Sequence, residues 1–381
     1  MITLPHTPLC SRRQLLRTVA TAASVCAVPT WSIAASSSRG PIVAQVVDTS
    51  PQQQDVAQDF LIGSRAAWQD INTHGGLRGT AVHHLVIEVD GSAASLHSAI
   101  SKISDTPGCV VISGSVGGAV ATQLMQLLRN EKLAIAHAAP WLPTLPTEKD
   151  DRTFAIFASR QAQITQVLKN QASLGIKQLG VIYASARDEA LHQKDVQLSA
   201  AQMQISLQTF RANDDLRALG QRLGPNTPAM LLFVGGTPEL ARFAQGLDKQ
   251  ARQRYVIGLA DINLQTLAQM GGKFQTPIIA AQAVPQVTSG LQVVRQYRQV
   301  MAQLFDEAPS PLSLSGFIAA RYTYEVMNDI TGPLTRTQVL EAFQRRTSID
   351  LGGFQVSPSL SKNNIRLVTQ SMLTNDGRVI S

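Results

Sequence analysis

The sequence of 381 residues has only three cysteines, and their positions exclude a fold built on disulfides. Cys10 and Cys26 lie within the first 34 residues, which are considered separately below, so Cys109 is the one cysteine in the rest of the chain. A single cysteine forms no internal disulfide, even in an oxidising compartment. We interpret Cys109 as a small buried residue at the start of a strand.

The chain also has only a small excess of positive over negative charge. Lysine and arginine together number 33, and aspartate and glutamate number 26. Three of the arginines lie in the first 34 residues, so the remaining chain has an excess of only four positive charges. No basic run is interleaved with aromatic residues, which excludes a typical nucleic-acid-binding surface. No group of histidine, cysteine or carboxylate residues has the spacing of a metal site, and no cofactor fingerprint is present.

Long hydrophobic runs are missing as well. The run Thr18–Ala34 is interrupted by a serine, a proline and a tryptophan, and it is too short to cross about 30 Å of hydrocarbon comfortably. It follows the pair Arg12 and Arg13 and ends in small residues, which is typical of a twin-arginine export signal. We predict that residues 1–34 are removed and that the rest works in the periplasm without a membrane span. An uncleaved anchor and lipid attachment at Cys26 are the alternatives.

Short apolar runs alternate with helical stretches along the rest of the chain. We predict strands near residues 41–47, 81–89, 109–113, 133–137, 178–183, 229–234, 254–258 and 278–282, and helices over 56–71, 291–304 and 317–326. Several strand runs are apolar almost throughout, as expected when helices cover both faces of a parallel sheet. The pattern predicts a doubly wound α/β fold. One strand–helix series precedes residue 157 and another follows it, which indicates two similar lobes.

Catalytic motifs are not recognisable. The string Ser113–Gly117 resembles a nucleophile elbow only loosely, because that motif needs glycine where Ser113 stands. No histidine lies at a position in the sequence that obviously pairs with Ser115. We interpret the string as a glycine-rich turn whose backbone N–H groups let a ligand approach. His137 closes a strand at the sheet edge where such folds bind ligands, and both a structural role and a ligand contact remain open for it.

Several motifs carry a family resemblance. An asparagine precedes a double glycine at Asn72 and Gly75–Gly76, and Gly114–Gly118, Gly316–Arg321 and Leu351–Phe354 follow in order over more than 200 residues. The chain thereby resembles the type I periplasmic binding proteins of the leucine/isoleucine/valine class, the solute receptors of ABC importers. The resemblance implies two doubly wound Rossmann-like lobes that are joined by three chain crossings and close over a solute.

The resemblance also implies where the lobes begin and end. It covers about residues 40–378 as one leucine-binding-protein-like domain. The first lobe would comprise 40–157 and 286–347, and the second lobe 158–285 and 348–381.

By the same resemblance, the solute contacts lie in loops at the strand ends of both lobes. They are Ser115, Gly117, Gly118, Ala138, Ala139, Pro140, Trp141, Asp188, Thr237 and Asp261. The chain departs from the family's amino-acid binders in three of these loops: Gly117–Ala119 lack the hydroxyl expected in the first, Pro140 replaces a threonine, and Asp261 lies one position after the expected acid. Trp141 offers a flat face to an aromatic or amide ligand, or else it closes the core of the lobe; both interpretations remain open.

The resemblance therefore implies the substrate-binding component of an ABC importer, with an ABC permease in the inner membrane as its partner. The solute would be a small organic molecule such as an amino acid, an amide or an aromatic carboxylate. We expect no catalytic residue, cofactor, metal or nucleic-acid partner. The alternatives are a periplasmic sensor that reports to a membrane receptor kinase and, from another class, an exported enzyme.

Overall fold

The computed structural model describes residues 40–144, 150–211, 215–248, 250, 252–270, 274–304, 307–346, 348–357 and 367–380. The predicted export signal at 1–34 lies outside these residues. Within the described ranges, no helix combines the length and the apolar character that a bilayer crossing requires.

A five-stranded parallel sheet, in the order β2-β1-β3-β4-β5, forms the centre of the first lobe. Its strands are β1 (Ile42–Asp48), β2 (His83–Val89), β3 (Cys109–Ser113), β4 (Ala136–Ala138) and β5 (Thr153–Phe154). All five residues of β3 are buried, including Cys109, because helices cover both faces of the sheet.

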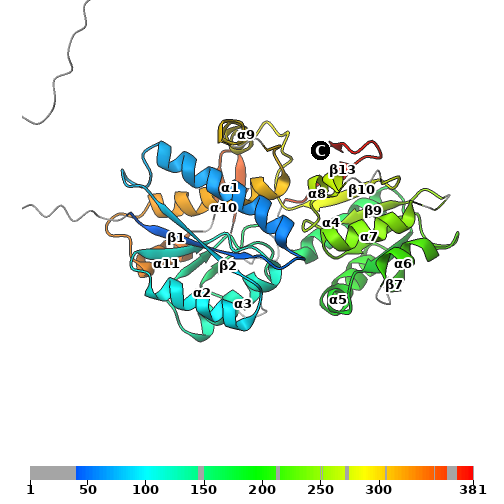
Figure 1. Cartoon of the computed structure of the whole chain (residues 1–381), viewed down its shortest axis with the longest axis horizontal. Coiled ribbons are helices and arrows are strands. Elements are labelled where there is room, and N and C mark those ends of the chain that lie inside the picture. The colour runs from blue at the N-terminus through cyan, green and yellow to red at the C-terminus, as the bar shows by residue number, and fades with distance from the viewer. Residues whose placement is uncertain are drawn as a thin grey trace, which may run out of the picture. The chain divides into compact units, whose positions relative to one another are not determined.

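The helices of the first lobe form two layers, one on each face of this sheet (Figure 1). One layer contains α1 (Gln54–Thr73), α9 (Gln292–Leu304), α10 (Pro311–Asn328) and α11 (Arg336–Arg345). The other contains α2 (Ala93–Asp105) and α3 (Gly118–Asn130). This arrangement confirms the doubly wound α/β prediction for the first lobe.

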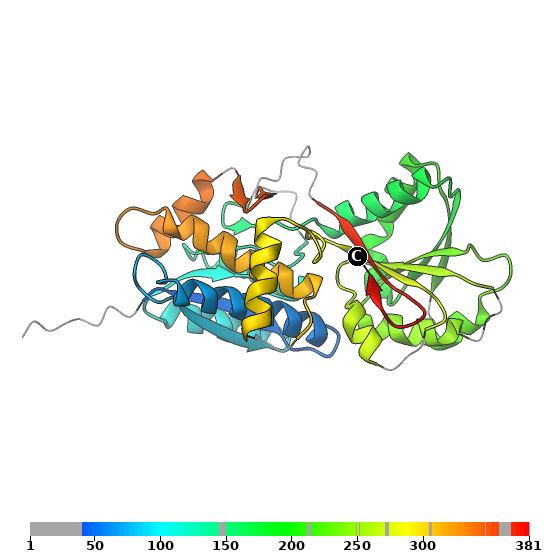
Figure 2. The same ribbon diagram turned by 90° about the horizontal axis from the view of Figure 1, so that it is seen from above.

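A seven-stranded sheet forms the second lobe, in the order β14-β13-β10-β9-β8-β6-β7. Its strands are β6 (Gln178–Tyr183), β7 (Ser206–Arg211), β8 (Met230–Val234), β9 (Tyr255–Gly258), β10 (Ile278–Gln282), β13 (Thr369–Leu373) and β14 (Val379–Ile380). The first five pair in parallel, whereas β13 runs antiparallel to β10 and to β14; Figure 2 shows β13 in red alongside β10.

Helices again cover both faces of the second sheet. On one face lie α4 (Arg160–Ser173) and α5 (Ala186–Gln202), and on the other lie α6 (Leu216–Arg222), α7 (Thr237–Leu247) and α8 (Leu264–Gln269). The two lobes thus repeat one architecture, as the two strand–helix series of the sequence predict.

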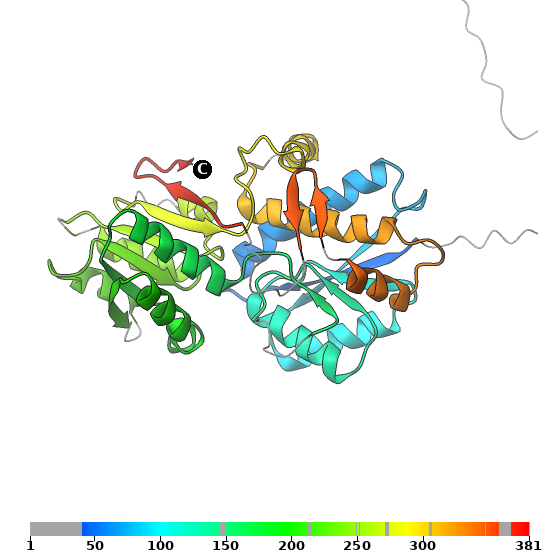
Figure 3. The same ribbon diagram turned by 180° about the vertical axis from the view of Figure 1, so that it is seen from behind.

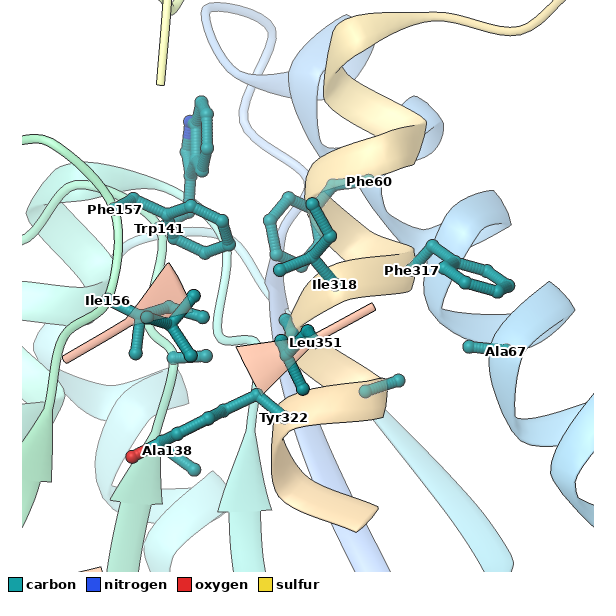
Figure 4. Close-up of a cluster of buried hydrophobic side chains, with 14 of the residues drawn as sticks. Phe60, Ala67, Ala138, Trp141, Ile156, Phe157, Phe317, Ile318, Tyr322 and Leu351 are labelled. Atoms are coloured by element: carbon teal, nitrogen blue, oxygen red, sulfur yellow. The ribbon is translucent and has the colours of Figure 1, made fainter. Parts of the chain in front are cut away.

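A hairpin of β11 (Ile349–Leu351) and β12 (Phe354–Val356) stands beside α10 (Figure 3). Leu351 belongs to the same buried cluster as Ile318 and Tyr322 of α10, and Figure 4 shows these side chains together. The predicted lobe boundaries assign residues 348–381 to the second lobe. We propose instead that the first lobe extends through the hairpin and that the chain returns to the second lobe between Val356 and β13.

Helices α1 and α10 approach each other so closely that only glycine fits at their contact. A Cβ atom on Gly63 would overlap the carbonyl oxygen of Ser313, and one on Gly316 would overlap the carbonyl oxygen of Phe60. In the second lobe, α6 and α7 make the same kind of close contact through glycines.

There, a Cβ on Gly220 would lie 2.6 Å from the carbonyl oxygen of Phe243, and one on Gly246 would overlap the carbonyl oxygen of Arg217. Backbone-to-backbone contact of this kind tolerates no added methyl group without movement of a helix.

We predict that Gly316→Ala lowers the free energy of unfolding by about 1–3 kcal/mol or more, since the methyl group forces α1 and α10 apart. Urea unfolding measures this change. Gly290→Ala is the matched control, because a Cβ at Gly290 has no neighbour within 4 Å and its φ lies outside the left-handed region. Equal unfolding midpoints for the two variants would contradict the close helix contact.

Candidate functional site

The glycine-rich turn after β3 is fixed by backbone hydrogen bonds to neighbouring elements. The Trp141 amide donates to the Ser115 carbonyl at 2.8 Å, and the Val116 amide donates to the Val46 carbonyl at 2.9 Å. Helix α3 then begins at Gly118, and its N-cap residue, Gly117, has a φ of 95° and provides no side-chain cap. The uncapped amides of the first turn of α3 therefore remain as donors for a ligand.

Ser115 is paired with a histidine that the sequence does not reveal. The Ser115 hydroxyl lies 2.6 Å from Nε2 of His137, because β3 and β4 are adjacent in the sheet. Both side chains are fully buried, and burial lowers the pKa of His137 to about 4. A nucleophile must be reached by its substrate, so this pair is a buried structural bond between the turn and β4. The structural role left open for His137 is the one that its surroundings favour.

Trp141 lies in the core of the first lobe. Its indole ring is fully buried, with centroids 5.6 Å from the ring of Phe60 and 5.2 Å from that of Phe157 (Figure 4). The loop residues Ala138–Pro140 are buried as well, and Ala139 has a left-handed φ of 47°. Of the two interpretations of Trp141, the packing favours closure of the core over a ligand-stacking face.

Arg160, the first residue of α4, links the two lobes. Its Nε donates to Oδ2 of Asp261 at 2.8 Å, and its Nη1 donates to the Leu142 carbonyl in the first lobe at 2.7 Å. The guanidinium lies against the start of α3, since a Cβ on Gly118 would be 2.6 Å from Nη1. The positive end of α3 and a guanidinium thus face one another, an arrangement that attracts an anion such as a carboxylate.

Thr237 and Asp261, both predicted from the resemblance, lie together in the second lobe. The Thr237 hydroxyl donates to the Asp261 carbonyl at 3.4 Å and accepts the Asn263 amide at 3.0 Å. Across the lobe boundary lies Asp55, in the first turn of α1. Burial raises the pKa of Asp55, the nearby Thr237 hydroxyl opposes this, and the charge of Asp261 adds a small further rise.

Asp59 makes a second direct contact between the lobes. Its Oδ2 accepts the Ser310 hydroxyl of the first lobe at 2.8 Å and the Asn263 side-chain amide of the second at 3.1 Å. Burial raises the pKa of Asp59, and these two hydrogen bonds act in the opposite direction. Beside it, Gln265 of α8 donates to the Pro309 carbonyl at 2.9 Å.

Asp188 lies at the beginning of α5 and is half-buried. It accepts the Ser185 hydroxyl at 2.6 Å, and its amide donates to Ser185 Oγ at 3.1 Å, so it completes the cap of the helix. Asp188 also belongs to the charged surroundings of His192. Burial lowers the pKa of His192, as does Arg160, whereas Asp188 and Asp261 raise it.

The structure therefore brings the predicted residues into three places: the turn and loop after β3 and β4, the Thr237–Asp261 pair, and the start of α5. Sequence reasoning missed the charged groups that lie between the lobes, namely Arg160, Asp55 and Asp59. An acid in the first turn of α1 is an ordinary helix-start feature, so the sequence contains no signal that marks Asp55. Across the described residues, no three histidine, cysteine or carboxylate side chains come together as a metal site.

A family model described as periplasmic binding protein matches residues 42–375. The chain belongs to the periplasmic binding protein family. Its two-lobed architecture is the type I form of that fold, and the predicted resemblance is confirmed. A search of curated proteins finds no match.

Solved structures share this fold at low sequence identity. An extracellular ligand-binding receptor from Verminephrobacter eiseniae is 18% identical with a TM-score of 0.77, and the match covers 90% of this chain and 100% of that one. A fatty acid ABC transporter substrate-binding protein from Thermomonospora curvata is 13% identical with a TM-score of 0.72, covering 90% and 91%. A branched-chain amino acid ABC transporter protein from Thermus thermophilus with bound valine is 12% identical with a TM-score of 0.72, covering 90% and 94%.

We predict that this periplasmic binding protein loses stability as the pH falls from 6.5 towards 4, in part through His137. The folded pKa of about 4 lies below the value of 6.5 for an unperturbed histidine. In that window the unfolded chain binds a proton that the folded chain does not, so the free energy of unfolding falls with pH, by roughly 3 kcal/mol in full.

Urea unfolding of the wild type and of His137→Gln at pH 7.5 and 4.5 measures this contribution. The variant should lose less stability between the two pH values. His97→Gln, at an exposed position of α2, is the control and should follow the wild type. A His137→Gln variant with the wild-type pH dependence would contradict the prediction.

Proposed function

We propose that this chain is the exported substrate-binding component of an ABC importer and that it works in the periplasm after removal of residues 1–34. The observation that carries the proposal is the set of charged and polar groups linking the two lobes, in which Arg160 joins Asp261 to the first lobe and Asp59 joins Ser310 to the second. A solute bound among these groups would contact both lobes at once. It would therefore bind the closed arrangement better and shift the population towards it.

The proposed solute is a small organic molecule that carries a carboxylate, such as an amino acid or an aromatic carboxylate. Arg160 and the uncapped start of α3 provide the complementary positive groups. The solved relatives named above are described with valine and as a fatty acid transporter component, and both of those solutes are carboxylic acids. An amide would present a neutral oxygen to the same donors and bind less strongly.

We further propose that the protein catalyses no reaction on its solute. The Ser115–His137 pair is the arrangement that most resembles a nucleophile with its base, and both side chains are fully buried. An ABC permease would recognise the closed form, and transport would follow without covalent chemistry in this chain.

Native mass spectrometry of the protein purified from its natural compartment tests the proposal directly, because a tightly bound solute remains with the folded chain. Protein that has been unfolded, dialysed and refolded is then screened against amino acids, amides and aromatic acids by thermal unfolding. A true solute raises Tm by mass action, equivalent to about 2.7 kcal/mol at a hundredfold excess over Kd. A refolded protein that no solute of any class stabilises would overturn the proposed function.

We predict that Arg160→Gln weakens the binding of a carboxylate solute at least about tenfold, the loss expected for a charged hydrogen-bond partner. Arg160→Lys keeps the charge but not the planar donor pair, so its affinity should lie between those of the wild type and the glutamine variant. Isothermal titration measures all three proteins. Arg345→Gln, on the exposed surface of α11, is the control for loss of one positive charge. If Arg160→Gln binds the carboxylate solute with the affinity of the wild type, Arg160 does not hold the carboxylate.

A further inference from the structure

One carboxylate oxygen joins the beginnings of two helices that belong to different lobes. Oδ2 of Asp59, on α1 of the first lobe, accepts the Ser310 hydroxyl at 2.8 Å and the Asn263 side-chain amide at 3.1 Å. Ser310 is the N-cap of α10 in the first lobe, and Asn263 is the N-cap of α8 in the second. The contact therefore couples two helix caps, and with them the two lobes, through groups of the protein itself.

Asn263 is held in place for this contact by its own lobe. Its Oδ1 accepts the amides of Gln265 and Thr266, each at 3.1 Å, and its backbone amide donates to the Thr237 hydroxyl at 3.0 Å. The side-chain NH₂ group then points away from α8 and donates to Asp59. Asn263 is 3% exposed, so this bond is largely shielded from water.

A second contact between the lobes lies beside the first. Gln265, two residues after Asn263, donates from Nε2 to the Pro309 carbonyl at 2.9 Å, and Pro309 immediately precedes Ser310. The acceptor segment is fixed as well, because the buried Tyr297 hydroxyl accepts the Ser310 amide at 2.9 Å. Both contacts thus connect the first turn of α8 with elements that the core of the first lobe positions.

The space between these groups is too small for a solute. The cavity that Asn263, Gln265 and Ser310 help to line has a volume of about 10 Å³. That volume holds about one water molecule at most. The two hydrogen bonds are therefore direct contacts between the lobes and need no bound solute to form.

We propose that the Asn263–Asp59 and Gln265–Pro309 hydrogen bonds form a latch that holds the lobes closed in the absence of a solute. A hydrogen bond between neutral groups shifts an equilibrium about fivefold, and one to an ionised group shifts it more than about tenfold. Two such bonds that exist only in the closed form therefore favour closure of the empty protein. The latch goes beyond the proposed function, because it is built from the chain alone and acts whatever the solute is.

A latch of this kind changes how a binding protein takes up its solute. The solute enters through the open form, so the rate constant of association falls with the fraction of molecules that are open. The affinity changes little once most empty molecules are closed, because the same two bonds are present in the empty and in the filled closed form. The latch therefore controls the rate of uptake from a place that the solute does not touch.

Two substitutions break the latch and preserve the beginning of α8. Gln265→Glu removes the donor to the Pro309 carbonyl, and Asn263→Asp removes the donor to Asp59 and adds a second carboxylate beside it. Aspartate caps a helix as well as asparagine does, and an acid in the first turn suits the helix dipole. Gln338→Glu, the same change in the first turn of α11, is the matched control, because that side chain contacts the cap of its own helix.

Double electron–electron resonance on solute-free protein, prepared by unfolding, dialysis and refolding, measures closure. Gln126→Cys of α3 and Lys194→Cys of α5 place one spin label at an exposed position of each lobe, and Cys109 is buried and does not react. We expect the distance of the closed form to dominate in the wild type and in the control. In the double variant Asn263→Asp/Gln265→Glu, we expect a longer distance to become the major one, with each single variant in between.

Urea unfolding of the same proteins separates a latch from a purely structural role. Loss of a structural bond lowers the unfolding midpoint and leaves the distance between the labels unchanged, whereas loss of the latch lengthens that distance. An empty wild type in which the longer distance dominates would overturn the latch, and so would a folded double variant with the wild-type distribution.

These outcomes are independent of the importer function, because the measurement uses no solute. An empty protein that is mainly open removes the latch and leaves the proposed function as it stands. A refolded protein that no solute stabilises overturns the proposed function, and the distances between the labels still decide whether the latch exists.

Discussion

The close contact of α1 with α10 is the constraint on which much of the candidate site depends. Gly63 and Gly316 let the two helix backbones touch, and this fixes the start of α1 beside the start of α10. Ser310 caps α10 and at the same time donates to Asp59, one helical turn before Gly63. Asp59 and Ser310, which meet the second lobe, are therefore positioned by the core of the first lobe. A shift in this helix contact would move both residues relative to the second lobe.

Arginine side chains also stabilise the C-terminal ends of several helices. Guanidinium groups donate to backbone carbonyls at or just beyond the C-termini of α2, α3, α6 and α10; these arginines are Arg336, Arg152, Arg254 and Arg78. They satisfy carbonyls that have no partner within the helix and oppose the negative end of its dipole.

Local patterns in the sequence predicted the buried strands and the long helices. They did not predict features that depend on contacts between distant segments of the chain. The apolar runs of β6 and β8 were sufficient to predict them, whereas β7 escaped because it is an edge strand with mostly exposed or half-exposed residues. The pairing of Ser115 with His137 depends on the adjacency of β3 and β4 in the sheet, which no spacing in the sequence expresses. Family resemblance pointed to the strand-end loops. It did not reveal Arg160 or Asp55, because their importance arises only where the two lobes meet.

Asp55 and Asp59 show how a structure separates residues that look alike in a sequence. Both are aspartates on α1, one turn apart, and burial raises the pKa of each. Asp59 accepts hydrogen bonds from Ser310 and from Asn263, so its charge helps to hold α10 and the second lobe in place. Asp55 accepts none. The contacts of Asp59 thus link the two lobes, whereas burial remains the largest influence on the pKa of Asp55.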